Sequence, residues 1–562
     1  PNMDVLIMMG TTAAFFYSIS GTLIFWGTVE AHQYLFFETT ATIITLVLLG
    51  NVLEHRSVKQ TTSAIKDLSS IQNLEAKREK TDGTIETVSF KNIVKEDILL
   101  VNSGDKVPTD GTIISGEGYF DESMMTGESH SILKKSNEDV VGGTILLNGN
   151  IKMIAKKVGE DTVLSHIIKL IKKAQSNKPN IQRLGDKVSS IFVPVVLLIA
   201  ILTFTLSYLV FDINLSQAIM RSIAVLVISC PCAMGLATPT AVMVGLGRAA
   251  KNGILIKGGN TLEEFAKVKN IVFDKTGTLT TGNFKIDSID CEDKQRKEVV
   301  NLLYSLELHS SHPIAKSIIK ELENEAVVLE LEEIKEIKGQ GIQAKWKGDL
   351  YKLGSAHFVN HKEGKQQLFL FKNNGFLAGI NCSDEIKENL KETILELNKE
   401  GLSTTMLSGD KIEKCKSVGN AIGIYNVYGE HLPHEKLEKI DHLNKQGLTA
   451  MIGDGINDAP ALAKAHVGIS LGESTEVAIE SAQIVLLNTE NLKQITLAYK
   501  ISKHTLKTIK QNLFWAFSYN IVAIPIAALG FLNPMWGALF MAFSDVIVIG
   551  NSLRLKRKNI SK

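Results

Sequence analysis

The sequence predicts a multidomain membrane protein, in which a core of six transmembrane helices carries a β-rich soluble segment and a larger α/β segment. Three observations lead to this prediction. A chain of 562 residues exceeds what one hydrophobic core normally serves. Its apolar residues gather in stretches of about 20 residues, which is the length that crosses a bilayer. The two long segments between these stretches, 55–187 and 248–511, are polar and rich in Lys.

The apolar stretches form three pairs, and the links within each pair contain no Lys or Arg. They lie near 4–26, 34–53, 188–210, 216–244, 512–531 and 534–551. The long segments and the C-terminal "LRLKRKNISK" are rich in Lys and Arg, which the links within the pairs lack, so we expect them to face the cytoplasm, in the cell (inner) membrane. A formal net charge of +1 gives no indication of a nucleic-acid partner. Because the chain begins with Pro1 and enters a span at once, we expect a truncated N-terminus.

The fourth apolar stretch contains "SCPCAMGLATP", in which Pro231 separates Cys230 from Cys232. Proline costs about 3 kcal/mol inside a helix, because it removes a donor and clashes with the preceding turn. Thiolates are soft ligands that select Cu(I) or, less exclusively, Zn(II). The break would let both sulfurs turn toward one ion. The alternative is that the cysteines are small apolar residues beside a kink.

The first long segment reads as short β-strands separated by turn residues, and its "DESMMTGES" loop could be an ordinary polar turn. In the second long segment, three apolar runs end on carboxylates: "NIVFD" on Asp274, "STTMLSGD" on Asp410, and "LTAMIGDGIND" on Asp454 and Asp458. Sites in open parallel sheets form beyond the carboxyl ends of the strands. We therefore expect a shared Mg²⁺ and phosphate site here. Helix capping would explain any one of these residues but not the set.

The motifs "DKTGTLTTG" (274–282), "MLSGD" (406–410) and "MIGDGINDAP" (451–460) resemble those of the P-type ATPases. The TGE of 126–128 and the intramembrane CPC narrow the resemblance to the heavy-metal-transporting branch. Within that branch, the Tyr519–Asn520 pair and Met541 resemble the pattern of the copper(I)-exporting members. It implies a β-rich actuator domain and a haloacid-dehalogenase-like, Rossmannoid phosphorylation domain with an inserted α+β nucleotide-binding domain. The domains implied are 1–54 (transmembrane helices 1–2), 55–180 (actuator), 181–250 (helices 3–4 with CPC), 251–282 and 395–505 (phosphorylation), 283–394 (nucleotide-binding) and 506–562 (helices 5–6 and basic tail).

The resemblance implies a role for each residue of the phosphorylation site. Asp274 is the nucleophile that takes the γ-phosphoryl group of ATP. Thr276 and Thr278, with Lys275, cradle the phosphoryl oxygens. Asp454 holds Mg²⁺, Asp458 supports it, and Lys436 neutralises the charge that develops on the phosphate. Glu128 directs water at the phosphoenzyme.

For nucleotide binding, the resemblance implies Glu307, His312, Gly339, Gly341, Gly354 and Asp410. Two positions depart from the family pattern: Ser311 replaces a Glu in "SSHP", and Ser355 replaces an Asn after Gly354. A lone His before Pro is otherwise more often a packed or solvated surface residue.

In the membrane, the resemblance implies that Tyr519, Asn520 and Met541 complete the site of Cys230 and Cys232. Asp545 departs from the copper pattern, which has the second of two serines there. It could be a proton partner, a harder ligand or a sign of altered specificity. A zinc pump would instead show Lys in the fifth span and an acidic residue at Met541.

Glu38 and Glu54 lie sixteen residues apart on the second span, about 24 Å along a helix. The resemblance implies that Met3, Glu54 and Asp186 receive the ion and that Glu38 helps to release it. Ordinary interfacial charge is the alternative for Glu54 and Asp186.

We therefore expect an ATP- and Mg²⁺-dependent pump that exports copper(I), with silver(I) as a further candidate ion, after delivery by a cytoplasmic copper chaperone. The alternatives are a zinc or cadmium pump, a non-transporting metal sensor and a related phosphatase.

Overall fold

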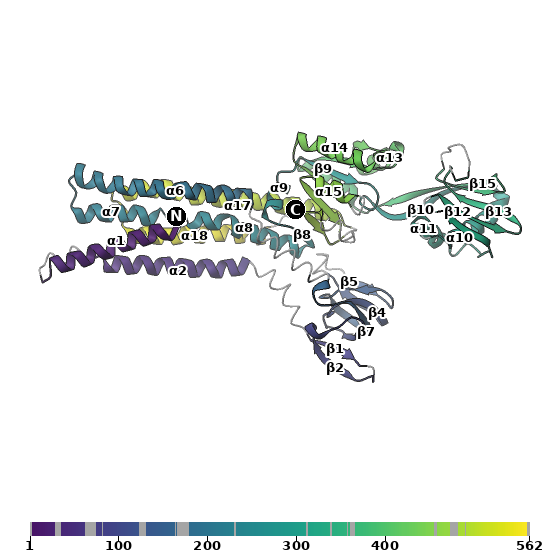
Figure 1. The fold of residues 1–562 in the computed structure, drawn as a ribbon, viewed down its shortest axis with the longest axis horizontal. Coiled ribbons are helices and arrows are strands. Elements are labelled where there is room, and N and C mark those ends of the chain that lie inside the picture. The colour runs from purple at the N-terminus through teal and green to yellow at the C-terminus, as the bar shows by residue number, and fades with distance from the viewer. Residues whose placement is uncertain are drawn as a thin grey trace.

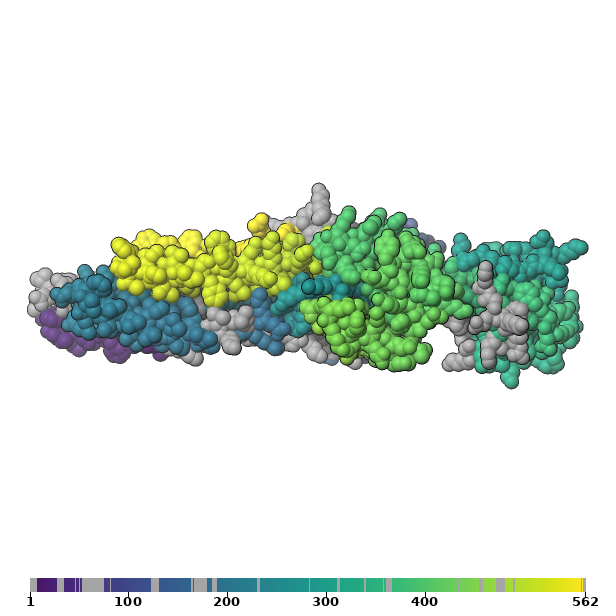
Figure 2. Space-filling view, turned by 90° about the horizontal axis from the view of Figure 1, so that it is seen from above, coloured from purple at the N-terminus to yellow at the C-terminus, as the bar shows by residue number. Residues whose placement is uncertain are grey.

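The computed structural model describes residues 3–27, 35–61, 75–80, 82–122, 131–162, 165, 179–229, 232–310, 313–337, 340–356, 358–359, 366–453, 458–471, 481–488 and 491–558. The molecule is elongated (Figures 1 and 2). A helical bundle forms one end, a mainly parallel sheet lies at the centre and an antiparallel sheet forms the other end. A further antiparallel sheet lies near the end of the bundle that adjoins the central sheet.

The bundle consists of α1 (Met3–Ile24), α2 (Phe37–Thr61), α6 (Asn180–Thr205), α7 (Leu215–Ile228), α8 (Cys232–Lys251), α17 (Lys493–Ala528) and α18 (Pro534–Arg557). Each of the six predicted apolar stretches overlaps one or two of these helices. Within the described part of the chain, three stretches are long and apolar enough to cross a membrane: Ser190–Val210, Leu215–Lys251 and Pro534–Lys556. A shorter apolar stretch, Phe37–Leu49, lies on α2.

The helix α17 begins far outside the apolar stretch predicted at 512–531. It is 36 residues long and starts at Lys493, inside the polar segment. Hydropathy locates only the half of such a helix that faces lipid. The other half packs into the core of the central sheet, where Tyr499 makes an edge-to-face contact with Phe265 at 5.7 Å between ring centroids. One rigid element thus connects the membrane bundle to the central sheet.

The fourth predicted stretch forms two helices. The first, α7, ends at Ile228, and Ser229 Oγ donates to the Val225 carbonyl at 2.5 Å. The second, α8, begins at Cys232. Cys230, Pro231 and the side chain of Cys232 lie outside the described residues, so the predicted convergence of the two sulfurs remains a prediction.

The β-rich character predicted for the first soluble segment is confirmed. Its antiparallel sheet has the order β2-β1-β3-β7-β4-β5, with β6 paired to β4. The strands are β1 (Glu75–Glu79), β2 (Ile85–Ser89), β3 (Ile98–Asn102), β4 (Asp110–Asp121), β5 (Ser131–Lys134), β6 (Asp139–Val140) and β7 (Ile145–Lys157). Leu99, Phe120 and Met153 are fully buried in its core.

The central sheet has the order β17-β16-β9-β18-β19-β20-β8, and its paired strands are parallel except for β8. The strands are β8 (Ile254–Ile256), β9 (Asn270–Asp274), β16 (Ser403–Leu407), β17 (Asn426–Tyr428), β18 (Thr449–Gly453), β19 (Val467–Leu471) and β20 (Ile484–Leu486). Its helices are α9 (Gly259–Phe265), α12 (Leu390–Lys399), α13 (Ile412–Ile422), α14 (Pro433–Gln446) and α15 (Ala459–Lys464). The three buried strands predicted from the sequence are β16, β9 and β18, and they lie side by side in this sheet as parallel strands.

The distal sheet is inserted between β9 and β16 and has the order β10-β15-β14-β13-β12-β11. Its strands are β10 (Thr280–Cys291), β11 (Glu332–Ile337), β12 (Gly341–Trp346), β13 (Asp349–Gly354), β14 (Leu368–Lys372) and β15 (Gly375–Ile386), and α10 (Arg296–Glu307) and α11 (Pro313–Leu322) pack on it. The long strands β10 and β15 carry the chain out of the central unit and back (Figure 1).

Candidate functional site

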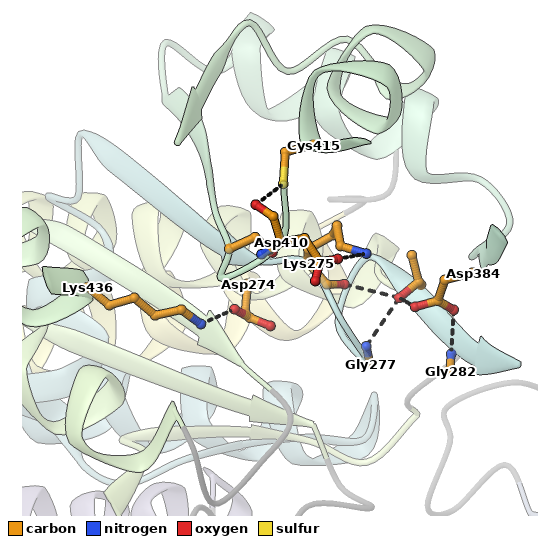
Figure 3. A network of polar contacts seen from close by, with 10 residues as sticks. Asp274, Lys275, Gly277, Gly282, Asp384, Asp410, Cys415 and Lys436 are labelled. Carbon is orange, nitrogen blue, oxygen red and sulfur yellow. Dashed lines mark hydrogen bonds and ion pairs between the residues drawn. The ribbon is translucent and has the colours of Figure 1, made fainter. Parts of the chain in front are cut away.

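Asp274 ends the central strand β9 and is only 6% exposed. Its Oδ1 lies 2.5 Å from Lys436 Nζ, which comes from α14, and the same nitrogen lies 3.1 Å from Asp458 Oδ1 (Figure 3 shows the first contact). Burial alone would lower the pKa of Lys436, but the carboxylates of Asp274 and Asp458 outweigh it and raise that pKa. Lys436 therefore remains a cation, and two buried carboxylates share its charge.

A second ion pair lies beside the first. Lys275 Nζ contacts Asp410 Oδ2 at 2.6 Å, and Asp410 follows the neighbouring strand β16 (Figure 3). The backbone of Asp410 is itself fixed, because its N–H donates to Ser408 Oγ at 3.2 Å and its carbonyl accepts from the Glu430 N–H at 2.8 Å. The structure thus brings together the carboxylates predicted at two strand ends.

The loop after Asp274 places its two predicted threonines differently. Thr276 is exposed, whereas Thr278 is fully buried and its Oγ1 has no hydrogen-bond partner among the described residues. Gly277 lies between them with φ +72°, in the left-handed region that glycine adopts at little cost. An unpaired buried hydroxyl costs about 1–3 kcal/mol, so its retention beside Asp274 fits a role in binding a phosphoryl oxygen.

Sequence reasoning missed Asp384 and Lys387, which tie this loop to the inserted sheet. Asp384 accepts from Thr280 Oγ1 at 2.5 Å and from the Gly282 N–H at 3.1 Å (Figure 3). Lys387 Nζ donates to the Gly277 carbonyl at 3.1 Å. Burial raises the pKa of Asp384, although its bond from Thr280 partly opposes this. The sequence signal that could have indicated them is an acidic and a basic residue close together where the chain returns from the inserted sheet to the central sheet.

The described residues fit a magnesium ion in part. Asp274 and Asp458 offer hard carboxylate oxygens on adjacent elements, which is the donor type that Mg²⁺ prefers. No group of three or more His, Cys, Asp or Glu able to hold a metal occurs within the described ranges. Asp454 and Glu128, predicted to complete the magnesium site and to direct water, lie outside them, so their roles remain predictions.

Three residues predicted to bind nucleotide line one pocket of about 170 Å³ on the inserted sheet: Glu307, Gly341 and Gly354. Ser355, the departure from the family pattern, lines it too. Burial, assisted by the charge of Glu336, raises the pKa of Glu307 to about 7. His312 and Gly339 lie outside the described residues.

The two glycines of this pocket face each other across β12 and β13. A Cβ at Gly341 would lie 2.3 Å from the Leu353 carbonyl oxygen, and one at Gly354 would lie 2.4 Å from the Gln340 carbonyl oxygen. Any larger residue would therefore push the strands apart. This close approach accounts for both glycines without a nucleotide.

In the membrane bundle, α17 and α18 bring the other predicted ion-site residues close together. Asn520 and Met541 are 6% and 4% exposed, and Tyr519 Oη lies 3.5 Å from the Gly537 carbonyl oxygen. Asp545 is also buried. Glu38 is exposed in the first turn of α2. The side chains of Met3, Glu54 and Asp186 lie outside the described set, so the predicted entry path remains a prediction.

Comparison with known protein families matches two parts of the chain. Residues 70–172 match the P-type ATPase actuator domain, and residues 268–466 match the haloacid dehalogenase-like hydrolases. These parts contain the first antiparallel sheet and most of the central and inserted sheets.

Relatives cover the whole chain. A copper-exporting P-type ATPase of Staphylococcus haemolyticus is 42% identical over 578 residues, which cover 100% of this chain and 72% of that protein. A probable copper-importing P-type ATPase A of Enterococcus hirae is 42% identical over 582 residues, covering 100% of this chain and 78% of that protein.

A crystal structure of a zinc-transporting PIB-type ATPase in the E2.Pi state is 27% identical, with a TM-score of 0.63. The match covers 99% of this chain and 94% of that one. Sequence and fold agree with the geometry of the Asp274 site: the chain belongs to the metal-transporting P-type ATPases.

Proposed function

We propose that this protein is a pump that uses ATP to export copper(I) from the cytoplasm, with silver(I) as a further substrate. The observation that carries this proposal is the buried group of Asp274, Lys436 and Asp458 at the end of β9, together with relatives named for copper transport. The proposal includes the expected division into actuator (55–180), phosphorylation (251–282 and 395–505) and nucleotide-binding (283–394) domains.

Asp274 has the surroundings that a phosphoryl acceptor needs. One carboxylate oxygen attacks the γ-phosphorus of ATP, the bond to the bridging oxygen breaks and ADP leaves, so the aspartyl-phosphate stores the energy of the reaction. Lys436 neutralises charge on the transferred group, and Thr278 donates its hydroxyl to it. Asp454 and Asp458 would hold Mg²⁺, which supplies further charge neutralisation. Glu128 would direct the water that later cleaves the phosphoenzyme.

The helix α17 supplies a physical link between phosphorylation and transport. Its cytoplasmic half forms one ion pair from Lys500 to Glu396 on α12 and another from Lys503 to Glu400, which follows α12, the latter at 2.7 Å. Its membrane half carries Tyr519 and Asn520. A shift of the central unit would move both halves together, so ion binding and phosphorylation can bias the same conformational equilibrium.

The ion path in this proposal begins at the cytoplasmic face. A cytoplasmic copper chaperone would deliver the ion to Met3, Glu54 and Asp186. Cys230 and Cys232 would bind it with Tyr519, Asn520 and Met541, and Glu38 would assist its release outside the cell (inner) membrane. The soft thiolates favour a soft monovalent ion.

A zinc or cadmium pump is the second candidate, favoured by Asp545 and by the likeness to a zinc-transporting structure. The test is the ATPase activity of the purified protein with Cu(I), Ag(I), Zn(II) or Cd(II). The proposal predicts that Cu(I) gives the largest stimulation, and no stimulation by Cu(I) would overturn it. Because one relative is named as importing, uptake of Cu(I) by inside-out vesicles tests the direction.

A further inference from the structure

The lipid-facing side of α17 becomes basic where this helix leaves the membrane bundle. Phe514 and Trp515 are 63% and 56% exposed, near the start of the apolar stretch predicted at 512–531. Lys510 and Lys507 precede Phe514 by four and seven residues, so they lie on the same face of the helix, and both are exposed. At a rise of 1.5 Å per residue, they lie about 6 Å and about 10 Å from Phe514 along the axis. The headgroup region adds about 5–8 Å on each side of the hydrocarbon core, so both ammonium groups can reach it.

The helix α18 shows the same change at its C-terminal end. Phe543 and Ile547 are 59% and 52% exposed on one face of the helix. Arg554 continues that face seven residues after Ile547, Lys558 follows it at the end of the helix, and both are exposed. Figure 2 shows α17 and α18 on an outer face of the bundle, and Figure 1 places the C-terminal end where the bundle adjoins the central sheet.

Two contacts between the antiparallel helices bring these basic residues to one level. Asn512 Nδ2 donates to Ser552 Oγ at 2.9 Å, and about two turns away Lys558 Nζ lies 3.0 Å from His504 Nδ1. The part of α17 between these contacts therefore lies alongside the last turns of α18. We call the four exposed residues of this region the basic cluster: Lys507, Lys510, Arg554 and Lys558.

The charge of the basic cluster is not neutralised by the protein. The helix α17 contains no Asp or Glu between its ends, and the nearby Glu396 and Glu400 are paired with Lys500 and Lys503. Among the described residues, no carboxylate forms an ion pair with a member of the cluster. Burial lowers the pKa of His504, and the charges of Lys558 and Lys507 lower it further, although Glu400 partly opposes them. The cluster is thus a concentrated positive charge that needs an anionic partner from outside the chain.

We propose that the basic cluster binds the phosphate groups of anionic phospholipids in the leaflet that adjoins the central sheet. The position of the cluster favours a lipid over an acidic protein, because its residues continue the two helix faces that carry exposed Phe514 and Phe543. Basic residues beside a membrane span are attracted to the negative surface of such a leaflet. Bound headgroups fix the depth of α17, the helix that joins the bundle to the central sheet. This inference is independent of which metal the pump transports.

The test measures which lipid surrounds this end of α17 in the full chain. Trp515 is the reporter, because it lies five residues from Lys510, and Trp26, Trp346 and Trp536 are replaced by Phe. The protein is reconstituted in phosphatidylcholine bilayers that contain brominated phosphatidylglycerol or brominated phosphatidylcholine. Quenching of Trp515 then gives the affinity of the anionic lipid relative to the neutral one. One basic residue near an anionic headgroup is worth about fivefold in affinity, so phosphatidylglycerol should be preferred by at least that factor.

Three variants in the Trp515 background identify the source of this preference. The neutral variant removes the charge of the whole cluster: Lys507→Gln, Lys510→Gln, Arg554→Gln and Lys558→Gln. The charge-preserving variant keeps it: Lys507→Arg, Lys510→Arg, Arg554→Lys and Lys558→Arg. The matched control removes four exposed charges from the inserted domain: Lys285→Gln, Lys294→Gln, Lys297→Gln and Lys316→Gln.

The neutral variant should bind the two lipids equally, whereas the charge-preserving variant and the matched control should keep the preference of the Trp515 protein. Equal affinity for the two lipids before the cluster is altered would overturn the inference. A preference that survives in the neutral variant would overturn it too, since the cluster would then not be the binding site. Loss of the preference in the matched control would attribute it to overall charge and would also overturn the inference. Metal-stimulated ATPase activity is not a readout of this test, so its outcome leaves the copper proposal to be judged separately.

Discussion

Replacing Lys436 by Met should destabilise the central sheet around Asp274 in the absence of Mg²⁺. Lys436 Nζ lies 2.5 Å from an oxygen of Asp274 and 3.1 Å from an oxygen of Asp458, and the side chains of these two aspartates are only 8% and 4% exposed. Lys436→Met removes the ammonium group that lies between the two carboxylates. At a separation of no more than roughly 5.6 Å, the sum of these distances, and an effective dielectric constant of about 20, they repel by about 3 kcal/mol.

The assay is amide hydrogen exchange of the full chain, read on peptides that cover β9 and β18. Lys436→Met should lower the free energy of local opening there by about 3 kcal/mol, in line with the cost of removing one partner from a buried pair. Added Mg²⁺ should restore part of the protection, because it supplies positive charge to the same carboxylates.

The matched control is Lys439→Met, three residues along α14. Lys439 Nζ lies 3.7 Å from the centre of the Tyr428 ring, a contact worth about 1 kcal/mol or less at an exposed site. The electrostatic reasoning would be refuted if amide exchange in β9 and β18 were the same in Lys436→Met as in Lys439→Met. It would also be refuted if added Mg²⁺ did not slow the exchange of these strands in Lys436→Met.

Three further predictions concern the same domains. Thr278→Val should leave stability unchanged or raise it by about 1 kcal/mol, because it removes an unpaired buried hydroxyl, while the yield of phosphoenzyme falls; a normal yield would contradict the assigned role. The pKa of Glu307 is raised from 4.5 to about 7, so stability present below about pH 4.5 should be lost as pH rises through 7, by about 3 kcal/mol. Hydrogen exchange in β12 and β13 should show this loss, and Glu307→Gln should abolish its pH dependence. Asp384→Ala should lower local stability by about 2–4 kcal/mol where β10 and β15 join the central unit, because two hydrogen bonds to one carboxylate are lost. In the same exchange measurement, the control Asp287→Ala, on the exposed side of β10, should lower it far less.

The sequence predicted that the carboxylates around Asp274 lie together, because these residues belong to short motifs at strand ends. Asp274, Asp410 and Asp458 could be grouped from the strand pattern alone, since neighbouring parallel strands deliver their ends to one edge. The placement of Lys436 came from the family resemblance, and the structure shows the contact it makes.

Other features could not be predicted because they depend on contacts between distant segments. Asp384 lies about a hundred residues from Thr280, and only the pairing of β10 with β15 brings them together. The start of α17 was missed because hydropathy reports lipid contact, whereas its first half is buried against protein. The pairing of Gly341 with Gly354 likewise depends on the register of β12 and β13.

The most direct test of the central claim is phosphorylation of the purified chain with ATP labelled at the γ-phosphate, with and without Cu(I). We predict an acid-stable, hydroxylamine-sensitive phosphoenzyme that requires Cu(I). It should be absent from Asp274→Asn, which still binds copper, and Cu(I) should not stimulate its formation in Cys230→Ala. Labelling of Asp274→Asn, or phosphoenzyme formation in Cys230→Ala that Cu(I) still stimulates, would contradict the coupling of a soft-metal site to an aspartyl-phosphate at Asp274.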